Sequence, residues 1–395
     1  MRDRTDASVT ASYHGPGGPL FWLMVRTTIW NLLTLGLYRF WQRTLTRRHY
    51  WNGIRVQGSP LEYTGTGLEK FLGFTIAVVF LAVYLGVFQL AFFFVALRLS
   101  GGSEFVGLAS SLPVLPLIFY AQYRARRYML SRTQLRGIRF ALSPDAWRYT
   151  GRALLLMVPV VLTLGLLWPR LHWHLEKFRS DRTTYGNLRL FQQGRWAPLI
   201  WPWLWVMATG ILPYVALIGF TIADRPFAAL ASLVPFLFLP LALAHYSVRS
   251  FRIMTEGKSA GGLTFTSHAR TGTVIAIHLL GWLLIAVIST VLITVLLAVS
   301  SLLTGEGLDT LAQVEDPGDL LQFVTFWVVA AGYLGFFLIF SALYAVFITQ
   351  PVLAHFVATL DLHGVAELDL VRQREQDDFL EADGFADALD VGGGF

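Results

Sequence analysis

The 395-residue chain contains no cysteine and little charge. Without thiols it can form neither disulfides nor zinc–thiolate sites, and it cannot use thiol catalysis. Charged residues make up 14% of the chain and hydrophobic residues 55%, whereas a soluble domain is about 25% charged. The mean hydropathy is +0.55. This composition indicates a polytopic membrane protein.

Six runs lack Asp, Glu, Lys and Arg over a length that can cross a membrane, which takes about 17–25 apolar residues. They are residues 71–97, 105–123, 197–223, 227–248, 271–304 and 320–360. Two shorter runs are intermediate: residues 20–38, which include Arg26, and residues 153–168, which Pro169 ends. Ionisable residues inside spans mark ion or proton paths. Their absence from the six runs argues against ion-coupled pumping.

A cassette recurs along the chain, in which an arginine-bearing stretch precedes a short extended stretch centred on a turn residue. Four copies occupy residues 47–63, 126–142, 176–192 and 250–266. They align on Gly58, Gly137, Asn187 and Gly262, and His363 with Gly364 resembles a degenerate fifth copy. Single short strands are unstable alone. We therefore expect the copies to pair into one small cytoplasmic sheet.

A cation stands ten positions before each of these four turn residues. The four cations are Arg48, Arg127, Lys177 and Arg252. Arg124 lies three residues before Arg127, and Arg249 lies three residues before Arg252, so each pair shares a helix face. These pairs directly follow apolar runs, which places them at the ends of membrane helices.

The distribution of cations predicts the topology, because Lys and Arg near span ends stay on the cytoplasmic side. Most of the 31 cations lie in residues 39–70, 122–152, 170–196 and 249–272. Residues 305–319 contain only acidic charges and are predicted to be external. Since basic regions flank residues 153–168 on both sides, this segment and residues 20–38 are predicted to be re-entrant or interfacial helices. The alternative is eight full crossings with one misplaced basic loop.

The predicted fold is mainly α: three transmembrane helical hairpins with six spans, two re-entrant or interfacial helices, and a small sheet of short cytoplasmic strands. The chain then divides into five parts. These are a polar N-terminal tail (1–19), a first repeat unit (20–152), a second repeat unit (153–272), a third hairpin with the degenerate cassette (273–364) and an acidic, disordered C-terminal tail (365–395).

The first cassette and the segment before it carry a family resemblance. Leu33–Trp41 reads LTLGLYRFW, and it is followed by Arg47 and Arg48, then Gly58, Tyr63 and the turn Gly65–Gly67. This order resembles the YjgN-like, or DUF898, family of bacterial inner-membrane proteins. The resemblance implies a multi-pass protein of the inner membrane and no particular activity. Ser59-Pro60-Leu61 departs from the family pattern, in which a basic and an aromatic residue are expected.

Known catalytic and cofactor motifs are missing from the sequence. Gly65–Gly67 lacks the strand and the lysine of a phosphate-binding loop, and neither GxSxG nor HExxH occurs. His172, His174 and Glu176 are potential metal ligands, as are His355, Asp361 and His363. Residues two apart on a helix face about 200° apart, so we interpret these side chains as interfacial or packing residues. We predict no enzyme activity, no cofactor and no metal site.

Arginine gives the best indication of function, because only Lys70, Lys177 and Lys258 are lysines. Its planar fork binds phosphate in a bidentate manner. We predict a non-catalytic inner-membrane module that contacts anionic lipid headgroups or a partner protein. The candidate contacts are Arg48, Arg124, Arg127, Lys177, Arg249 and Arg252. The alternative is a passive channel or carrier for a small neutral or apolar solute. Cationic loops account for the pI of 9.6, so nucleic acid is not expected as a partner.

The topology can be tested with a reporter fused near Asn187, between two basic regions. The re-entrant interpretation of residues 153–168 requires a cytoplasmic signal from this position. The eight-span alternative requires an external signal at the same position.

Overall fold

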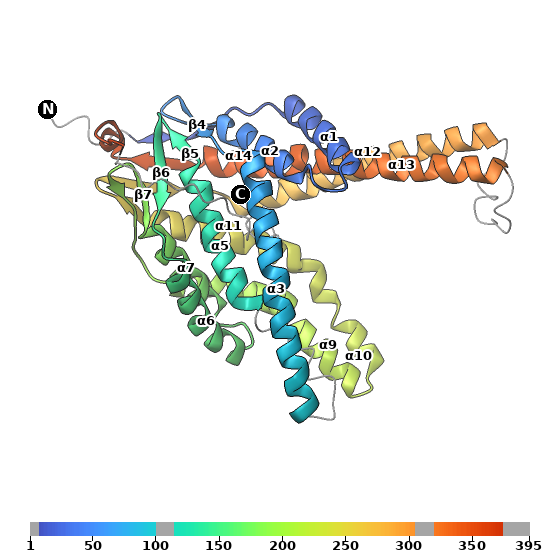
Figure 1. Cartoon of the computed structure of the whole chain (residues 1–395), viewed down its shortest axis with the longest axis horizontal. Helices are drawn as coiled ribbons and strands as arrows, with labels where there is room; N and C mark the ends of the chain where they lie inside the picture. The colour runs from blue at the N-terminus through green and yellow to red at the C-terminus, as the bar shows by residue number, and fades with distance from the viewer. Residues whose placement is uncertain (1–7, 100–113, 305–319, 374–395) are drawn as a thin grey trace. The chain divides into compact units, whose positions relative to one another are not determined.

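The computed structural model describes residues 8–99, 114–304 and 320–373, and Figure 1 labels many of its helices and four of its strands, β4 to β7. The chain forms two compact units. One, here called the helical unit, comprises residues 14–53 and 272–355. The other, called the sheet unit, comprises residues 54–271 together with both terminal segments.

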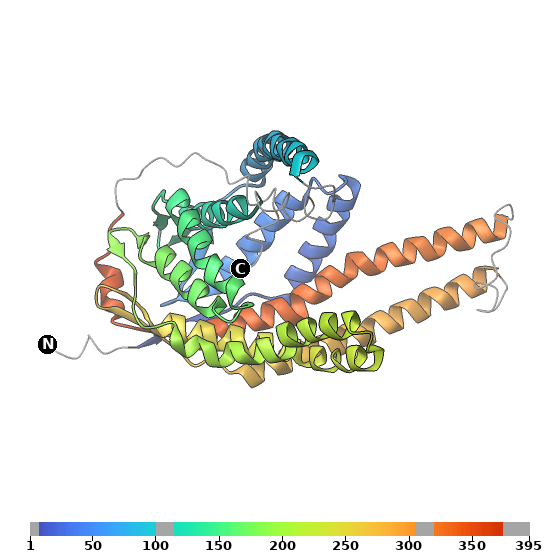
Figure 2. The same ribbon diagram turned by 90° about the horizontal axis from the view of Figure 1, so that it is seen from below.

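In the helical unit, helices α1 and α2 pair side by side, and α1 also packs against α13 (Figure 2). Ile285, Leu343 and Ile348 form its buried core, with Phe21 of α1 packed against them. The elements are α1 (Gly17–Leu33), α2 (Arg39–Gly53), α12 (Thr271–Thr304), α13 (Leu320–Tyr344), a π-helical turn η5 (Ala345–Thr349) and α14 (Gln350–Ala358).

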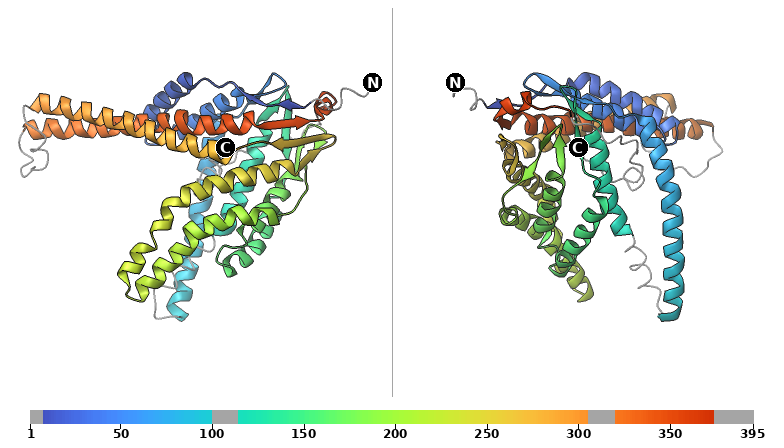
Figure 3. Two further views of the ribbon diagram at one scale, coloured as in Figure 1. Left: turned by 180° about the vertical axis from the view of Figure 1, so that it is seen from behind. Right: turned by 60° about the vertical axis from the view of Figure 1, so that its left-hand side comes forward.

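The sheet unit contains the remaining helices, two of which form a second helical hairpin. Helices α6 and α7 pack side by side, α5 packs on α6, and α8 packs along α11 (Figure 3). The helices are α3 (Gly67–Leu99), α5 (Val114–Ser131), α6 (Ala146–Leu162), α7 (Trp168–Ser180), η1 (Ala197–Leu199), α8 (Ile200–Val206), a π-helical turn η2 (Met207–Ile211), α9 (Leu212–Ile222), α10 (Pro226–Ala231), η3 (Val234–Phe238), α11 (Leu239–Glu256) and η6 (Val365–Asp369).

The strands form two antiparallel sheets within this unit, where the sequence predicted one. The seven-stranded sheet has the order β2-β3-β4-β5-β6-β7-β8, and the five-stranded sheet has the order β1-β12-β11-β10-β9. The strands are β1 (Val9–Thr10), β2 (Ser12–Tyr13), β3 (Ile54–Val56), β4 (Ser59–Tyr63), β5 (Thr133–Leu135), β6 (Ile138–Leu142), β7 (Thr183–Tyr185), β8 (Leu188–Arg189), β9 (Phe191–Gln192), β10 (Lys258–Ala260), β11 (Leu263–Ser267) and β12 (Leu360–His363).

The third cassette divides the strands between the two sheets. Its strands β7 and β8 pair with each other in the larger sheet, whereas β9 pairs with β10 in the smaller one. Leu190 separates β8 from β9, and the Asp181 side chain accepts a hydrogen bond from the Gln192 amide at 2.8 Å. The chain therefore leaves one sheet and enters the other within a single cassette.

Each of the four cassettes places a two-residue turn between paired strands, and the aligned turn residue is always the second. In the first copy Gln57 and Gly58 have φ values of 49° and 77°, and in the second copy Arg136 and Gly137 have 53° and 74°. Two consecutive positive φ values are the signature of the type I′ turns that join antiparallel strands. Turn geometry thus explains the glycine of the first two copies, whereas in the third and fourth copies the positive φ belongs to Gly186 and Gly261, one residue before the aligned position.

The sequence LTLGL occurs twice, at Leu33–Leu37 and at Leu162–Leu166, and both copies form the same tight turn between two helices. Leu35 and Gly36 turn α1 into α2 with φ values of 52° and 91°, and Leu164 and Gly165 turn α6 into α7 with 50° and 89°. The amide of each glycine donates to a carbonyl five residues earlier at 2.7 Å. Residues 20–38 and 153–168 therefore belong to helical hairpins that reverse direction at these glycines.

Five helical segments are long and apolar enough to cross a membrane among the residues that the structure describes. They are Gly67–Val95, Ala197–Ile222, Pro226–Glu256, Thr271–Ala298 and Leu334–Ala358. They correspond to five of the six predicted spans. Of the sixth, residues 105–123, residues 105–113 lie outside the described residues and residues 114–123 form the first part of α5. Helices α1 and α6, at 17 residues each, are not among these five segments.

The acidic C-terminal segment begins with ordered structure rather than with the disorder that its composition predicts. Helix η6 follows β12, and Asp369 pairs with Arg136 at 2.7 Å. The amide of Arg372 donates to the Asn187 side chain at 3.0 Å. These contacts hold residues up to 373 on two of the cassette turns.

The left-handed conformation of Gly165 makes a prediction about stability. Gly165→Ala should lower the free energy of unfolding by about 1–2 kcal/mol, because a Cβ is strained at this φ. Gly151→Ala in the adjoining helix α6 is the control, since a Cβ there meets no atom within 4 Å and alanine favours a helix. The measurement is thermal unfolding in detergent. A Gly165→Ala protein as stable as Gly151→Ala would contradict the prediction.

Candidate functional site

Arg249, one of the six predicted contact residues, lines a groove of about 460 Å³. One wall is a stripe of α11 formed by His245, Arg249 and Ile253, which are spaced four residues apart and so share one helix face. The opposite wall comes from η1 and α8 and consists of Pro198, Trp201, Pro202 and Trp205. The groove therefore combines a guanidinium group, an imidazole and two indole rings.

Three residues of this groove, Trp201, Trp205 and Arg249, stay exposed in the fold. Trp201 is 75% exposed and Trp205 is 64% exposed, and the Arg249 residue is also exposed. Trp203 faces the other way and packs in a core with Tyr246 and Ala242. Indole rings combine an apolar body with a polar N–H and favour the boundary between lipid and water. The groove thus presents an interfacial surface beside a cation.

Three of the other predicted residues are engaged with neighbouring side chains. Lys177 pairs with Asp181 at 3.0 Å, and its ammonium group also donates to the Gln192 carbonyl. Arg252 lies 3.8 Å from Glu256. Arg124 donates to the Tyr120 hydroxyl at 3.3 Å and lies over the ring of the same tyrosine.

The last two predicted residues lie in different units. Arg48 is an exposed residue of α2 in the helical unit, whereas Arg127 is a half-buried residue of α5 in the sheet unit. The structure therefore gives the shared cassette position several different environments. Equal spacing in the sequence did not mean equal accessibility.

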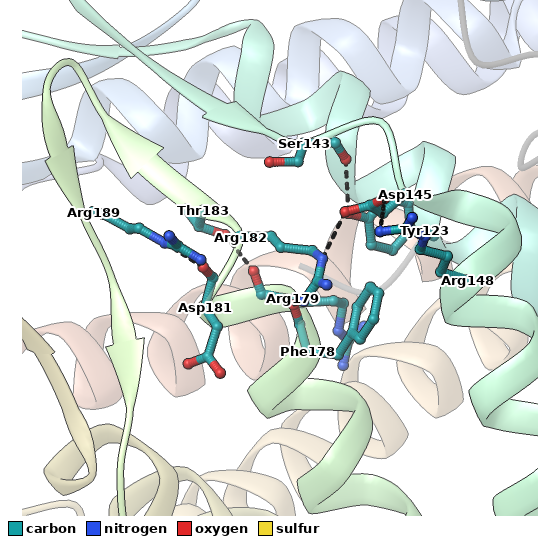
Figure 4. Close-up of polar contacts among 10 residues, drawn as sticks. All are labelled: Tyr123, Ser143, Asp145, Arg148, Phe178, Arg179, Asp181, Arg182, Thr183 and Arg189. Carbon is teal, nitrogen blue, oxygen red and sulfur yellow. Dashed lines mark hydrogen bonds and ion pairs between the residues drawn. The ribbon is translucent and has the colours of Figure 1, made fainter.

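Sequence reasoning missed an arginine cluster at the end of α7, which Figure 4 shows in close-up. The Arg182 guanidinium pairs with Asp145 at 2.7 Å and lies 3.6 Å from the ring centre of Phe178. Beside it, the Tyr123 hydroxyl donates to the Ser143 carbonyl at 2.7 Å. The only sequence signal was Ser-Pro-Asp before α6, which is typical of a helix start and gives no indication of the Arg182 partner. These contacts fix the β6–α6 connection to α7.

A second cluster missed by sequence reasoning surrounds the Glu176 carboxylate. One oxygen accepts from Lys258 at 2.8 Å and the other from Arg179 at 2.9 Å, while the side chain is only 13% exposed. Burial alone would raise the pKa of Glu176, but Lys258, Arg179 and Arg126 outweigh it and hold that pKa well below its ordinary value. Glu176 is therefore ionised at neutral pH.

The histidines considered as metal ligands are engaged in ring contacts and hydrogen bonds. His172 shares a hydrogen bond of 2.9 Å with the Tyr246 hydroxyl, and His174 packs edge-on against Trp173. Of the second group, Asp361 pairs with His268 at 3.3 Å, and His363 shares a hydrogen bond with Thr266. Within the described parts of the chain, no group of three His, Cys, Asp or Glu side chains is arranged to hold a metal ion.

Comparison with known proteins places the chain in a family. Residues 8–229, more than half of the chain, match the family described as "Bacterial protein of unknown function (DUF898)". The chain belongs to this DUF898 family. Its cassettes, helical hairpins and glycine turns up to α10 lie within the matched region, which confirms the resemblance seen in the first cassette.

Two curated relatives extend the comparison, both named "Inner membrane protein YjgN". The one from Escherichia coli O157:H7 is 23% identical over 157 residues, as is the one from Escherichia coli strain K12. Each match covers 39% of this chain and 35% of the relative, so the chain matches about a third of the length of these proteins. No solved structure is significantly similar. Five helices of the described residues are long and apolar enough to cross a membrane, and both relatives are named as inner membrane proteins. This DUF898 protein is therefore an integral membrane protein.

Removing the buried carboxylate should destabilise the sheet unit. Glu176→Gln leaves Lys258, Arg179 and Arg126 without their shared anion, and breaking a buried ion pair costs about 3–5 kcal/mol. We expect a clearly lower melting temperature in detergent. Glu256→Gln serves as the control, because its ion pair with Arg252 is exposed and such pairs contribute about 0–1 kcal/mol. Equal melting temperatures for the two variants would contradict this role.

The lowered pKa of Glu176 also predicts a pH dependence. A carboxylate whose pKa falls on folding stabilises the native state above its unfolded pKa, and this contribution is lost as the pH falls through the folded value. Wild-type stability should therefore fall on acidification below about pH 4.5, the ordinary pKa. The Glu176→Gln protein should lack this component in a pH series of thermal unfolding curves.

Proposed function

We propose that this protein is a non-catalytic module of the bacterial inner membrane whose arginine-rich cytoplasmic layer binds anionic lipid headgroups. The observation that carries the proposal is the groove between α8 and α11, with Arg249 between His245 and Ile253 and two exposed tryptophans opposite. The inner-membrane assignment is supported by the names of the two relatives.

The position of Arg249 along the chain suits a headgroup. It follows the uncharged run 227–248 by one residue, and Trp201 and Trp205 lie near the start of the run 197–223. The groove therefore lies between the start of one apolar segment and the end of the next. This is the depth at which a bilayer changes from hydrocarbon to headgroups. Positive charge in the flanking cassettes supports the cytoplasmic side for these ends.

The chemistry of the groove suits a phospholipid better than a soluble protein. The guanidinium offers a planar fork to a phosphate oxygen pair, and the indole rings offer apolar area to the glycerol and upper acyl region. The inner leaflet is anionic and attracts each nearby cation by about 1 kcal/mol. Two exposed tryptophans on a soluble face would instead be an aggregation liability.

Lipid retention tests the groove directly. The protein would be purified in mild detergent, mixed with equal amounts of phosphatidylglycerol and phosphatidylcholine, and analysed by native mass spectrometry. We expect preferential phosphatidylglycerol binding that Arg249→Gln weakens about fivefold, the factor that about 1 kcal/mol represents. Arg148→Gln is the matched control, because it removes the same charge from a side chain that is 78% exposed.

Two outcomes would contradict the proposal. Equal losses in the two variants would mean that net charge rather than the groove attracts lipid. Solute flux through wild-type protein in reconstituted vesicles, with no lipid preference, would favour the passive channel or carrier that the sequence left as the alternative.

A further inference from the structure

The opposite face of α11 lines a second cavity, of about 310 Å³. Its walls come from α7, from α11 and from the first residue of β10. The lining residues are His172, Glu176, Tyr246, Ser247, Ser250, Phe251, Met254, Thr255 and Lys258. The volume is at the lower end of the range for small-molecule sites, roughly 300–1,000 Å³. This cavity shares no lining residue with the groove between α8 and α11.

The charge around this cavity is unbalanced. Glu176 is the only carboxylate in its lining, whereas Lys258, Arg179 and Arg126 all act electrostatically upon it. Three cations around one carboxylate leave an excess of two positive charges in a half-buried place. Burial lowers the pKa of Arg126, as expected where positive charge is poorly solvated. Uncompensated buried charge is costly unless a counter-ion is present.

Hydrogen-bond donors in the same place also exceed the acceptors. Glu176 accepts one bond from Lys258, whose ammonium group has three N–H donors. The Nε of Arg179 is buried and has no hydrogen-bond partner among the described residues. The buried side chain of Thr255 adds a hydroxyl group to the lining, whereas the Ser250 hydroxyl donates to the Ser247 carbonyl at 3.0 Å. This surplus of donors fits a ligand that is rich in acceptors and negatively charged.

We infer that this cavity binds a phosphate group, held by Lys258 and the hydroxyl of Thr255, with Arg126 and Arg179 behind the lining supplying further positive charge. A phosphate monoester carries up to two negative charges and three terminal oxygens, which matches the charge excess and the number of donors. Phe251 and Met254 provide an apolar wall for the organic part of an ester. Tyr246 and His172, which share a hydrogen bond, also line the cavity.

The ligand chemistry is compatible with two sources: a soluble phosphate ester or the headgroup of a lipid. Full-length protein in detergent would be titrated with inorganic phosphate and with glycerol 3-phosphate at constant ionic strength, using sodium chloride as the reference. Binding would be followed by thermal shift and by isothermal calorimetry. In a parallel arm, the protein would be placed in phosphatidylcholine nanodiscs with or without phosphatidylglycerol.

We expect both soluble anions to raise the melting temperature relative to chloride. Lys258→Gln should weaken binding at least about tenfold, because it removes a charge-assisted donor. Ser250→Leu is the second variant, since it fills the cavity and leaves every charged residue in place. It should also weaken binding at least tenfold, which keeps the test decisive if the Lys258 variant does not fold. Arg148→Gln is the control, because Arg148 lies on α6 and does not line the cavity. This variant should bind the anions like wild type.

The outcomes separate the sources and can overturn the site. Binding of the soluble anions that Ser250→Leu abolishes assigns a soluble ligand. Stabilisation by phosphatidylglycerol nanodiscs alone, again abolished by Ser250→Leu, assigns a headgroup. No stabilisation beyond chloride in either arm, or binding that survives Ser250→Leu, would overturn the inference.

Discussion

The ion pairs of the buried Glu176 carboxylate are the interaction on which the rest of the sheet unit depends. It joins α7 to β10 through Lys258 and to its own helix through Arg179, and it lies within electrostatic range of Arg126 on α5. Because a charge in a poorly solvated place must be paired, this one group constrains the ends of three helices at once. Helix α11, which leads directly into β10, is held in place by the same contact.

The two cavities follow from that constraint. Helix α11 lies between α8 on one side and α7 on the other, so its two faces line different spaces. One face, with Arg249, meets exposed indole rings, and the other, with Ser250, meets Glu176 and His172. A single helix leaving an apolar segment thus lines both the groove proposed for lipid and the cavity proposed for a phosphate group.

The glycine-centred turns explain how short strands can hold such helix ends. Each hairpin follows a helix within a few residues, and neighbouring hairpins pair into sheets that no single copy would form alone. The third cassette contributes to both sheets, because the chain changes partners at Leu190. The antiparallel strand pairings of the two sheets therefore hold the ends of these helices together.

Much of the architecture was determined by the sequence itself, because local rules fix it. Uncharged length predicted the apolar spans, and the repeated turn residues at Gly58 and Gly137 predicted turns within short extended stretches. Only the tertiary structure decided what the cations do. Arg124 and Arg249 each lie three residues before a cassette cation, yet Arg124 donates to Tyr120 and Arg249 lines a groove. Glu176 and Lys258 are 82 residues apart, and neither residue's sequence neighbourhood specifies its partner. Electrostatic partners depend on distance in space, which spacing along a chain does not give.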